Sequence, residues 1–236
     1  MSKGTPQRLT MLMAACGLLM LGSASHAQIT LFEDFDTFLP TGWTRQNNSV
    51  SPQTDWIGFN RTTTVIPGLS QGAAVANYGS TAVKAATGGH ISNWLITPNL
   101  NLRDGDALSF YTASSDVFPD RLQVRWSATG TDTGSIWSDV GDFSTLLLDI
   151  NPSLTPTGYP HSWTQVSTFI TGIGSNYTSG YLAFRYFVTD GGENGTNSSG
   201  VGLDGVLVVS APEPGSAALA LLALPGVLLL RRRKAA

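Results

Sequence analysis

Residues that could catalyse a reaction are few in this chain and lie far apart. Ser70 sits in the stretch Gly-Leu-Ser-Gln-Gly, residues 68–72, which fits the G-x-S-x-G pattern of serine hydrolases. That pattern works on a strand–turn–helix elbow, with an acid and then a histidine following in an α/β fold, and no helical periodicity follows Ser70. His90 and His161 have no second histidine or cysteine at metal-ligand spacing. These residues predict a protein that is not an enzyme.

Two acids stand out because they lie inside apolar segments of strand length. Glu33 follows Thr-Leu-Phe near the start of the chain, and Asp204 follows Val-Gly-Leu near its end. If the first and last strands pair, the two carboxylates come together, and like charges raise each other's pKa unless a cation lies between them. Hard oxygen ligands suit calcium, so Glu33 and Asp204 predict a structural calcium site. The alternative is that backbone N–H groups or an arginine satisfy each carboxylate.

Six tryptophans invite a carbohydrate-binding interpretation, because sugar rings stack on exposed aromatic side chains. Trp126 falls on the apolar face of an alternating segment, which predicts packing in the core. Trp137, in a turn region with Gly and Ser, is the best candidate for exposure. The others are Trp43, Trp56, Trp94 and Trp163. An exposed, coplanar aromatic pair on one sheet would favour a defined sugar site.

The elements that position these residues are strands. Residues 121–128 alternate between apolar and polar side chains, which is typical of a half-buried strand. Further segments of strand length, rich in β-branched and aromatic residues, are 107–113, 143–150, 163–171, 181–189 and 201–209. Turns rich in Gly, Asn and Ser separate them, and residues 191–200 form a long loop. The pattern predicts an all-β fold, a two-sheet sandwich of the jelly-roll type.

The middle of the chain, residues 28–210, is acidic and has no cysteine. It carries seven basic and fifteen acidic residues, a net charge of −8. This balance argues against nucleic acid and anionic membranes as partners. The one cysteine of the chain, Cys16, precedes this part, so the domain uses neither disulfides nor thiolate chemistry.

The start of the chain has the three parts of a secretory signal peptide. Lys3 and Arg8 are basic, an apolar segment follows, and Ser25 and Ala27 are the small residues before a cleavage site. We therefore expect a signal peptide over 1–27, cleaved after Ala27.

The other end, residues 211–236, combines a Pro-Glu-Pro, an apolar segment and four basic residues. The apolar part, 215–230, has 16 residues. As a helix it spans about 24 Å, which is short against a bilayer core of about 30 Å. Pro225 and Gly226 weaken it further. The basic residues 231–234 would hold the end on the cytoplasmic side. We expect a transmembrane sorting tail that is held in the inner membrane and then cut.

This tripartite tail resembles that of PEP-CTERM proteins of Gram-negative bacteria that make exopolysaccharide. The resemblance implies that Pro212, Glu213 and Pro214 are a processing signal recognised by an exosortase, which is a membrane-embedded cysteine protease relative. The exosortase and, transiently, the inner membrane are then partners of this chain.

The middle of the chain resembles choice-of-anchor J domains, which are similar to MAM domains and to cleaved adhesin modules. The motifs that carry the resemblance include Asn-Trp-Leu-Ile-Thr-Pro at 93–98 and Gly-Leu-Asp-Gly-Val at 202–206, in the order that the family has. The family usually ends with two adjacent acids, and this chain has Gly205 at the second position. The resemblance implies a jelly-roll surface module, and a cation in a place comparable to Glu33 and Asp204.

Together these features predict an exported, non-enzymatic β-sandwich protein of the cell surface or exopolysaccharide matrix, with an adhesive or structural role. The alternative is a carbohydrate-binding module with a defined sugar site and surface glycans as partners. A secreted hydrolase is the third possibility. It would need two carboxylates across a cleft, and no acidic motif gathers on one strand of this chain.

Overall fold

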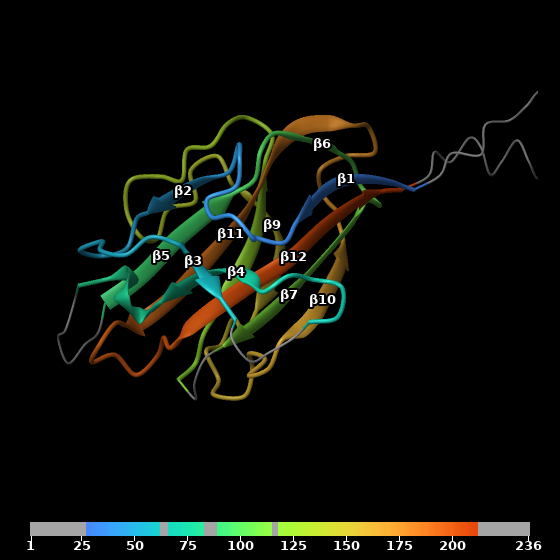
Figure 1. The fold of residues 1–236 in the computed structure, drawn as a ribbon. Helices are drawn as coiled ribbons and strands as arrows, with labels where there is room; N and C mark the ends of the chain where they lie inside the picture. Colours follow the sequence, from blue (N-terminus) through green and yellow to red (C-terminus); the bar gives the residue numbers. More distant parts are fainter. Residues whose placement is uncertain (1–26, 62–65, 83–88, 115–117, 212–236) are drawn as a thin grey trace, which may run out of the picture. The chain divides into compact units, whose positions relative to one another are not determined.

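A computed structural model describes residues 27–61, 66–82, 89–114 and 118–211, and these residues form two antiparallel β-sheets packed face to face (Figure 1). Sheet A contains β1 (Gln28–Glu33), β3 (Ile57–Asn60), β4 (Gly72–Asn77), β7 (Ala107–Ser114), β10 (Thr164–Phe169) and β12 (Gly200–Ser210). Sheet B contains β2 (Thr44–Asn47), β5 (Gly89–Ile96), β6 (Leu100–Leu102), β8 (Leu122–Ser127), β9 (Thr145–Ile150) and β11 (Thr178–Gly191). One 3₁₀ turn, η1 (Tyr78–Ser80), follows β4.

Strands that neighbour each other in a sheet are often far apart in the sequence. The order in sheet A is β10-β7-β12-β4-β3, and β1 pairs with the second half of β12. The order in sheet B is β2-β5-β11-β8-β9, and β6 pairs with the start of β11. The two longest strands, β11 and β12, are therefore the centres of the two sheets.

The core lies between the sheets because each central strand turns one set of alternate side chains inward. On β8, Leu122, Val124 and Trp126 are buried in the main hydrophobic cluster, as the alternation predicts. On β11 the inward side chains include Phe184 and Tyr186, and the ring of Phe184 packs edge-on against Phe110 of β7 at 5.3 Å.

Strand β12 changes its inward set halfway along. Val201 and Leu203 face the core in the first half, and Val206 and Val208 do so in the second. The ladder with β7 shifts between Asp204 and Leu207, and this bulge moves the inward set by one residue. Gly205 lies in the bulge with φ +55°, and a Cβ there would lie 2.5 Å from a methyl carbon of Leu69. A second acid would therefore be strained at position 205 in this chain.

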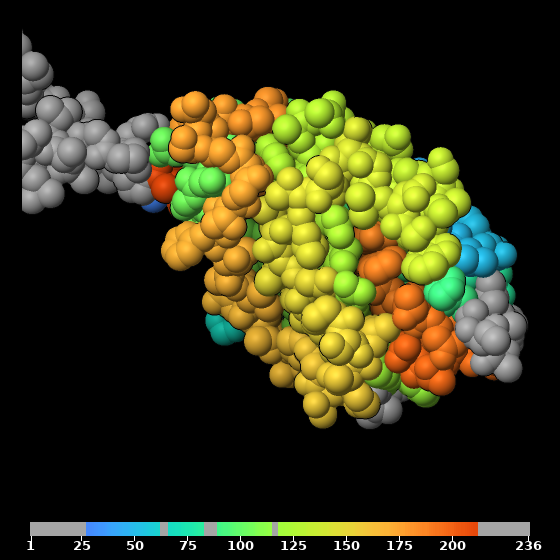
Figure 2. All heavy atoms as spheres, turned by 180° about the vertical axis from the view of Figure 1, so that it is seen from behind, coloured from blue at the N-terminus to red at the C-terminus, as the bar shows by residue number. Residues whose placement is uncertain are grey.

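The outer face of sheet B is covered by the chain itself. Residues 128–144, the covering segment, contribute Phe143, whose ring lies 5.4 Å from that of Trp94 on β5. These two form a second buried cluster with Ile96 and Ala183. Seen from behind, the yellow-green and yellow part of the chain spreads over the molecule (Figure 2).

The predicted two-sheet sandwich is confirmed, and each of the six predicted strand segments contains a strand. Strand β4, Gly-Ala-Ala-Val-Ala-Asn, was not predicted because alanine and glycine are depleted in strands and leave little signal. Within the part of the chain that the structure describes, no helix has the length and apolar character needed to cross a membrane. Residues 212–236 of the predicted tail 211–236 and residues 1–26 of the predicted signal peptide lie outside the described residues.

Candidate functional site

An apolar groove runs across the outer face of sheet A. We call it the sheet-A groove; its volume is about 350 Å³, and its lining is mostly apolar. Phe59 and Ile57 of β3 form one side, Trp163 forms the other, and Val75 and Gly202 lie between them. Phe59 is 53% exposed and lies beside the other apolar residues of the groove. Contiguous exposed apolar residues often mark a binding site. The groove has the size and composition of a small ligand site.

The Trp163 ring lies against strand β12 because β12 has a glycine, Gly202, at that position. A Cβ at Gly202 would lie 2.5 Å from the Trp163 ring, so only glycine lets this ring lie directly against β12. The guanidinium of Arg61 lies 5.0 Å from the centroid of the same ring, within the range of a cation–π contact. Trp163 is thus held between the backbone of β12 and a buried arginine.

Asp204 in turn holds Arg61. Its carboxylate Oδ2 lies 2.6 Å from Nη1 of Arg61, and both side chains are buried. The other oxygen, Oδ1, accepts a hydrogen bond of 2.6 Å from the Gly205 N–H. Arg61 also donates to the Ser70 carbonyl. Burial raises the pKa of the Asp204 carboxyl to about 7, although Arg61 and the Gly205 N–H act in the opposite direction.

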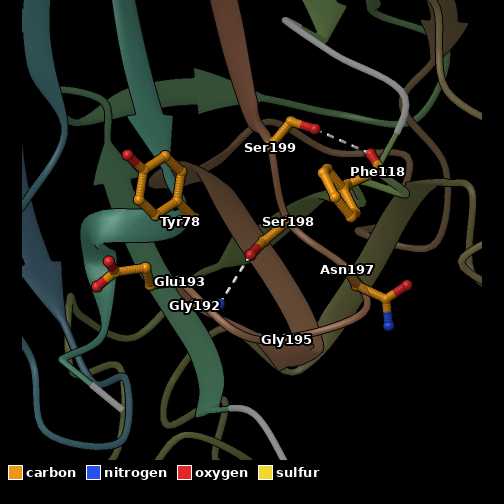
Figure 3. Close-up of a pocket in the computed structure, with 8 residues that line it drawn as sticks. All are labelled: Tyr78, Phe118, Gly192, Glu193, Gly195, Asn197, Ser198 and Ser199. Atoms are coloured by element: carbon orange, nitrogen blue, oxygen red, sulfur yellow. Dashed lines mark hydrogen bonds between the residues drawn. The ribbon is translucent and has the colours of Figure 1, made fainter. Parts of the chain in front are cut away.

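A second hollow, the loop hollow, lies where β12 begins. Its volume is about 260 Å³, and the loop 192–199 forms most of its wall. Tyr78 and Phe118 flank it on opposite sides, with Ser198 between them (Figure 3). Tyr78 and Phe118 are 49% and 47% exposed, so both rings present a surface to solvent.

Asp120 ties the loop hollow to both sheets, and its role was not predicted. The buried carboxylate accepts hydrogen bonds from Ser114 (2.6 Å), Tyr186 (2.6 Å), the Ser199 N–H (3.0 Å) and the Gly200 N–H (3.1 Å). Burial is the main cause that raises its pKa, and the four donors oppose it. In the sequence Asp120 is one of several aspartates in turns, and nothing there distinguishes it.

The predicted acid pair is placed near the bulge but each acid has its own protein partner. Strands β1 and β12 pair as expected, with Glu33 opposite Val206. The Glu33 carboxylate accepts a hydrogen bond of 2.8 Å from the Phe35 N–H, whereas Asp204 contacts Arg61 and Gly205. A backbone N–H or an arginine therefore satisfies each carboxylate, which is the alternative to calcium that the sequence left open. Among the described residues no group of three or more His, Cys, Asp and Glu side chains could hold a metal ion. Calcium at Glu33 and Asp204 stays a prediction.

The remaining predicted residues have plain surroundings. Ser70 precedes β4, so the chain continues into a strand where a nucleophile elbow would need a helix. His161 is exposed, and its Nε2 lies 3.0 Å from the Pro156 carbonyl oxygen. Ala27 is exposed and directly precedes β1. The predicted processing residues Pro212, Glu213 and Pro214 lie outside the described residues.

The tryptophans divide differently from the expectation. Trp126 is buried, as its alternating segment predicted, and Trp43, Trp56 and Trp94 are buried as well. Trp137 is half-buried, and its ring stacks with His90 at 3.9 Å and Phe187 at 5.9 Å. It is therefore part of the covering segment's packing, while Trp163 is the tryptophan that lines a groove.

The sequence matches no protein-family model, and no curated protein matches it either. Among solved structures, the chain is similar to the K1 cleaved adhesin domain of Lys-gingipain from Porphyromonas gingivalis W83, with a TM-score of 0.53 and 22% identity. This match covers 79% of the chain and 99% of that domain.

The K2 cleaved adhesin domain of Lys-gingipain matches with a TM-score of 0.51 and 17% identity, over 75% of this chain and 98% of that one. The CBM22-1 xylan-binding domain of a Paenibacillus barcinonensis protein aligns less well, with a TM-score of 0.42 and 12% identity, over 80% and 99%. The likeness to the two adhesin domains, at these identities, shows that the chain shares their β-sandwich fold.

Proposed function

We propose that the protein is an exported, non-enzymatic β-sandwich module of the cell surface or exopolysaccharide matrix that binds glycans through the sheet-A groove. Its fold is shared with cleaved adhesin domains of Lys-gingipain, which supports an adhesive role at the surface. The jelly-roll connectivity and the sorting by an exosortase belong to this proposal and are supported by the sequence motifs at 93–98, 202–206 and 212–214.

The single observation that carries glycan binding is the aromatic wall of the sheet-A groove. Phe59 and Trp163 stand on the two sides of a floor made of small residues such as Gly202. Sugar rings present apolar C–H faces that pack on aromatic rings, and their hydroxyl groups need a few polar neighbours, which Asn77 and Ser199 supply at one end of the groove. Of the three functions that the sequence left open, this groove favours carbohydrate binding.

The charge of the molecule narrows the glycan class. The domain carries a net charge of −8, and no Lys or Arg is among the described residues that line the groove. An acidic polysaccharide would meet repulsion there with no cation to offset it. The proposed ligands are therefore glycans without acidic groups.

Binding of the purified full-length chain to hydroxyethylcellulose, xylan, laminarin, glycol chitin and alginate tests this proposal by affinity electrophoresis. We expect retardation by at least one of the first four gels and none by alginate. Phe59→Ala removes an aromatic wall and should lose most of the retardation. Phe169→Ala is the matched control, because Phe169 is also an exposed phenylalanine on an edge strand of sheet A but does not line the groove. Free migration of the unmodified chain in all four gels would refute glycan binding.

Processing of the tail is tested separately. Replacing Glu213 by Ala should leave the protein in the inner membrane, since the Pro-Glu-Pro is the proposed recognition signal. Mass spectrometry of the released protein should show a C-terminus that ends before Ala236. A released form that still ends at Ala236 would contradict exosortase processing.

The calcium proposal has its own measurement. An ion that binds only the folded state stabilises it by mass action, by about 2.7 kcal/mol at one hundred times its dissociation constant. Melting curves of the native chain and of Glu33→Gln, in millimolar calcium and in chelator, measure this stabilisation of the folded state. Identical curves would exclude the ion and leave Arg61 as the counter-ion of Asp204.

A further inference from the structure

The sheet-A groove and the loop hollow share two lining residues. Tyr78 lines both of them, and so does Ser199 beside it. Both hollows therefore adjoin Tyr78, and Phe118 lies on the opposite wall of the loop hollow (Figure 3). We infer that the two hollows form one extended site for a glycan chain, in which Tyr78 is the shared central contact and Phe118 belongs to a second subsite. This inference rests on the proposed function and deepens it.

Hydrogen bonds fix the backbone that carries the shared residue Tyr78. Asn77 precedes η1, and its side-chain oxygen accepts a hydrogen bond of 2.9 Å from the Gly79 N–H. The Thr81 N–H bonds back to the Tyr78 carbonyl, and the Tyr78 N–H lies 3.4 Å from the Ser199 carbonyl oxygen. Because this backbone is fixed on both sides, a ligand that contacts Tyr78 does not have to order the turn that carries it.

The far wall is connected to the same loop. The Ser199 hydroxyl donates to the Phe118 carbonyl at 3.2 Å, and the Ser198 N–H donates to the Pro119 carbonyl at 2.9 Å. The Ser198 hydroxyl in turn accepts from the Gly192 N–H at 2.8 Å (Figure 3). Asp120 binds the end of this loop through the N–H groups of Ser199 and Gly200. The loop hollow is therefore preformed and does not need a ligand to order it.

The composition of the second subsite specifies the ligand further. Of the described residues that line the two hollows, Glu193 is the only charged one. An acidic sugar unit would meet the net negative charge of the domain, with no Lys or Arg among the described residues that line either hollow, whereas a neutral or N-acetylated unit would not be repelled. Two aromatic rings on opposite sides of the hollow suit a sugar ring placed between them. The ligand class is thus a chain of uncharged sugars long enough to cross Tyr78, and a single sugar would fill only one subsite.

Oligosaccharide ladders test the extended site. Cello-, xylo- and chito-oligosaccharides of two to six units are titrated into the purified full-length chain by calorimetry. Two linked subsites predict that affinity rises by at least about tenfold between the shortest and the longest member of the ladder that binds. Equal affinity along the ladder, or failure of all three ladders while a polysaccharide binds, would overturn the inference.

Three variants separate the subsites. Phe118→Ala should abolish the gain with chain length but leave the short members bound as before, because it removes only the second subsite. Phe59→Ala should weaken short and long members alike. Tyr78→Ala should cause the largest loss for the long members, because both subsites use its ring. Phe169→Ala is the control that should change neither.

The outcomes distinguish the two proposals. If Phe118→Ala retains the full gain with chain length, the second subsite is wrong and glycan binding by the sheet-A groove stands. If no polysaccharide and no ladder binds the native chain, the proposed function itself falls. Melting curves of each variant show whether a loss of binding reflects unfolding. Because the Phe118 side chain is half exposed, Phe118→Ala tests the inference even if Tyr78→Ala does not fold.

Discussion

The outer faces of the two sheets carry similar aromatic side chains but expose them very differently. On sheet B, Trp94 is fully buried under the covering segment, with Phe143 packed on its ring. On sheet A, Phe59 and Ile57 remain exposed beside an open groove. Within the described residues, the chain therefore covers the outer face of sheet B and leaves part of the outer face of sheet A exposed to solvent.

The two sheets also differ in the partners of their buried arginines. On sheet A, Arg61 is paired with the carboxylate of Asp204. On sheet B, Arg185 is buried with neutral partners: it donates to Ser92 at 2.9 Å and to the Trp137 carbonyl, and its guanidinium lies 3.8 Å from the Phe187 ring centroid. Burial is the main cause that lowers the pKa of Arg185, to about 9. On sheet B, Arg185 therefore fixes the covering segment through the Trp137 carbonyl. On sheet A, Arg61 and Asp204 fix Trp163 at the wall of the sheet-A groove.

The largest expected effect distinguishes the two faces by stability. Trp94→Ala removes a buried ring and should lower the free energy of unfolding by about 3–5 kcal/mol, because the cavity cannot refill. Urea denaturation followed by circular dichroism measures this. If Trp94→Ala were as stable as the native chain, the covering segment would not be packed as described, and the contrast between the faces would be lost.

A somewhat smaller loss is expected from Arg61→Met. Above pH 7, where the Asp204 carboxyl is ionised, the substitution leaves that carboxylate buried without its cation, which should cost about 3 kcal/mol. It should also weaken glycan binding, since Arg61 positions Trp163. Adding Asp204→Asn to Arg61→Met should restore part of the stability but not the binding. A double variant that loses stability additively would show that the pair does not interact.

Stability should also depend on pH through Asp204. The folded carboxyl has a pKa of about 7 against an ordinary value of 3.8, so between these values the folded chain holds a proton that the unfolded chain has lost. The contribution of this group to stability therefore falls as pH rises from about 4 to about 7, by at most about 1.4 kcal/mol per pH unit. Unfolding curves across this range should show that slope in the native chain relative to Asp204→Asn. Parallel pH profiles would contradict the raised pKa.

The smallest expected effect on stability is that of Phe59→Ala. Its exposed side chain should contribute within about 0.5 kcal/mol to folding, although its loss should remove most glycan binding. The same denaturation experiment as for Trp94→Ala gives the comparison directly. A loss of several kcal/mol at Phe59 would mean that the open face is structural after all.

The sequence predicted the strands more reliably than it predicted the site. Segments such as 121–128 and 181–189 carry regular alternation, so their strands and the inward side of Trp126 followed from pattern alone. Strand β4 carries no such pattern, although it pairs with the centre of sheet A. Trp137 was expected to be exposed because it lies in a turn region, but the covering segment stacks it on His90. Exposure of a turn residue depends on what the turn packs against, and local sequence does not contain that information.

The sequence by itself determined an acidic, cysteine-free, all-β domain, because charge, cysteine content and side-chain alternation act locally along the chain. Only the tertiary structure decided which aromatic rings reach solvent. Tyr78 and Phe118, forty residues apart, flank one hollow because η1 and the segment before β8 both bond to the loop 192–199. The sequence predicted that Asp204 lies inside a strand, but its partner Arg61 directly follows β3 and is far away along the chain. Such contacts depend on how strands from distant segments pair, and the pairing is set by burial of the whole core.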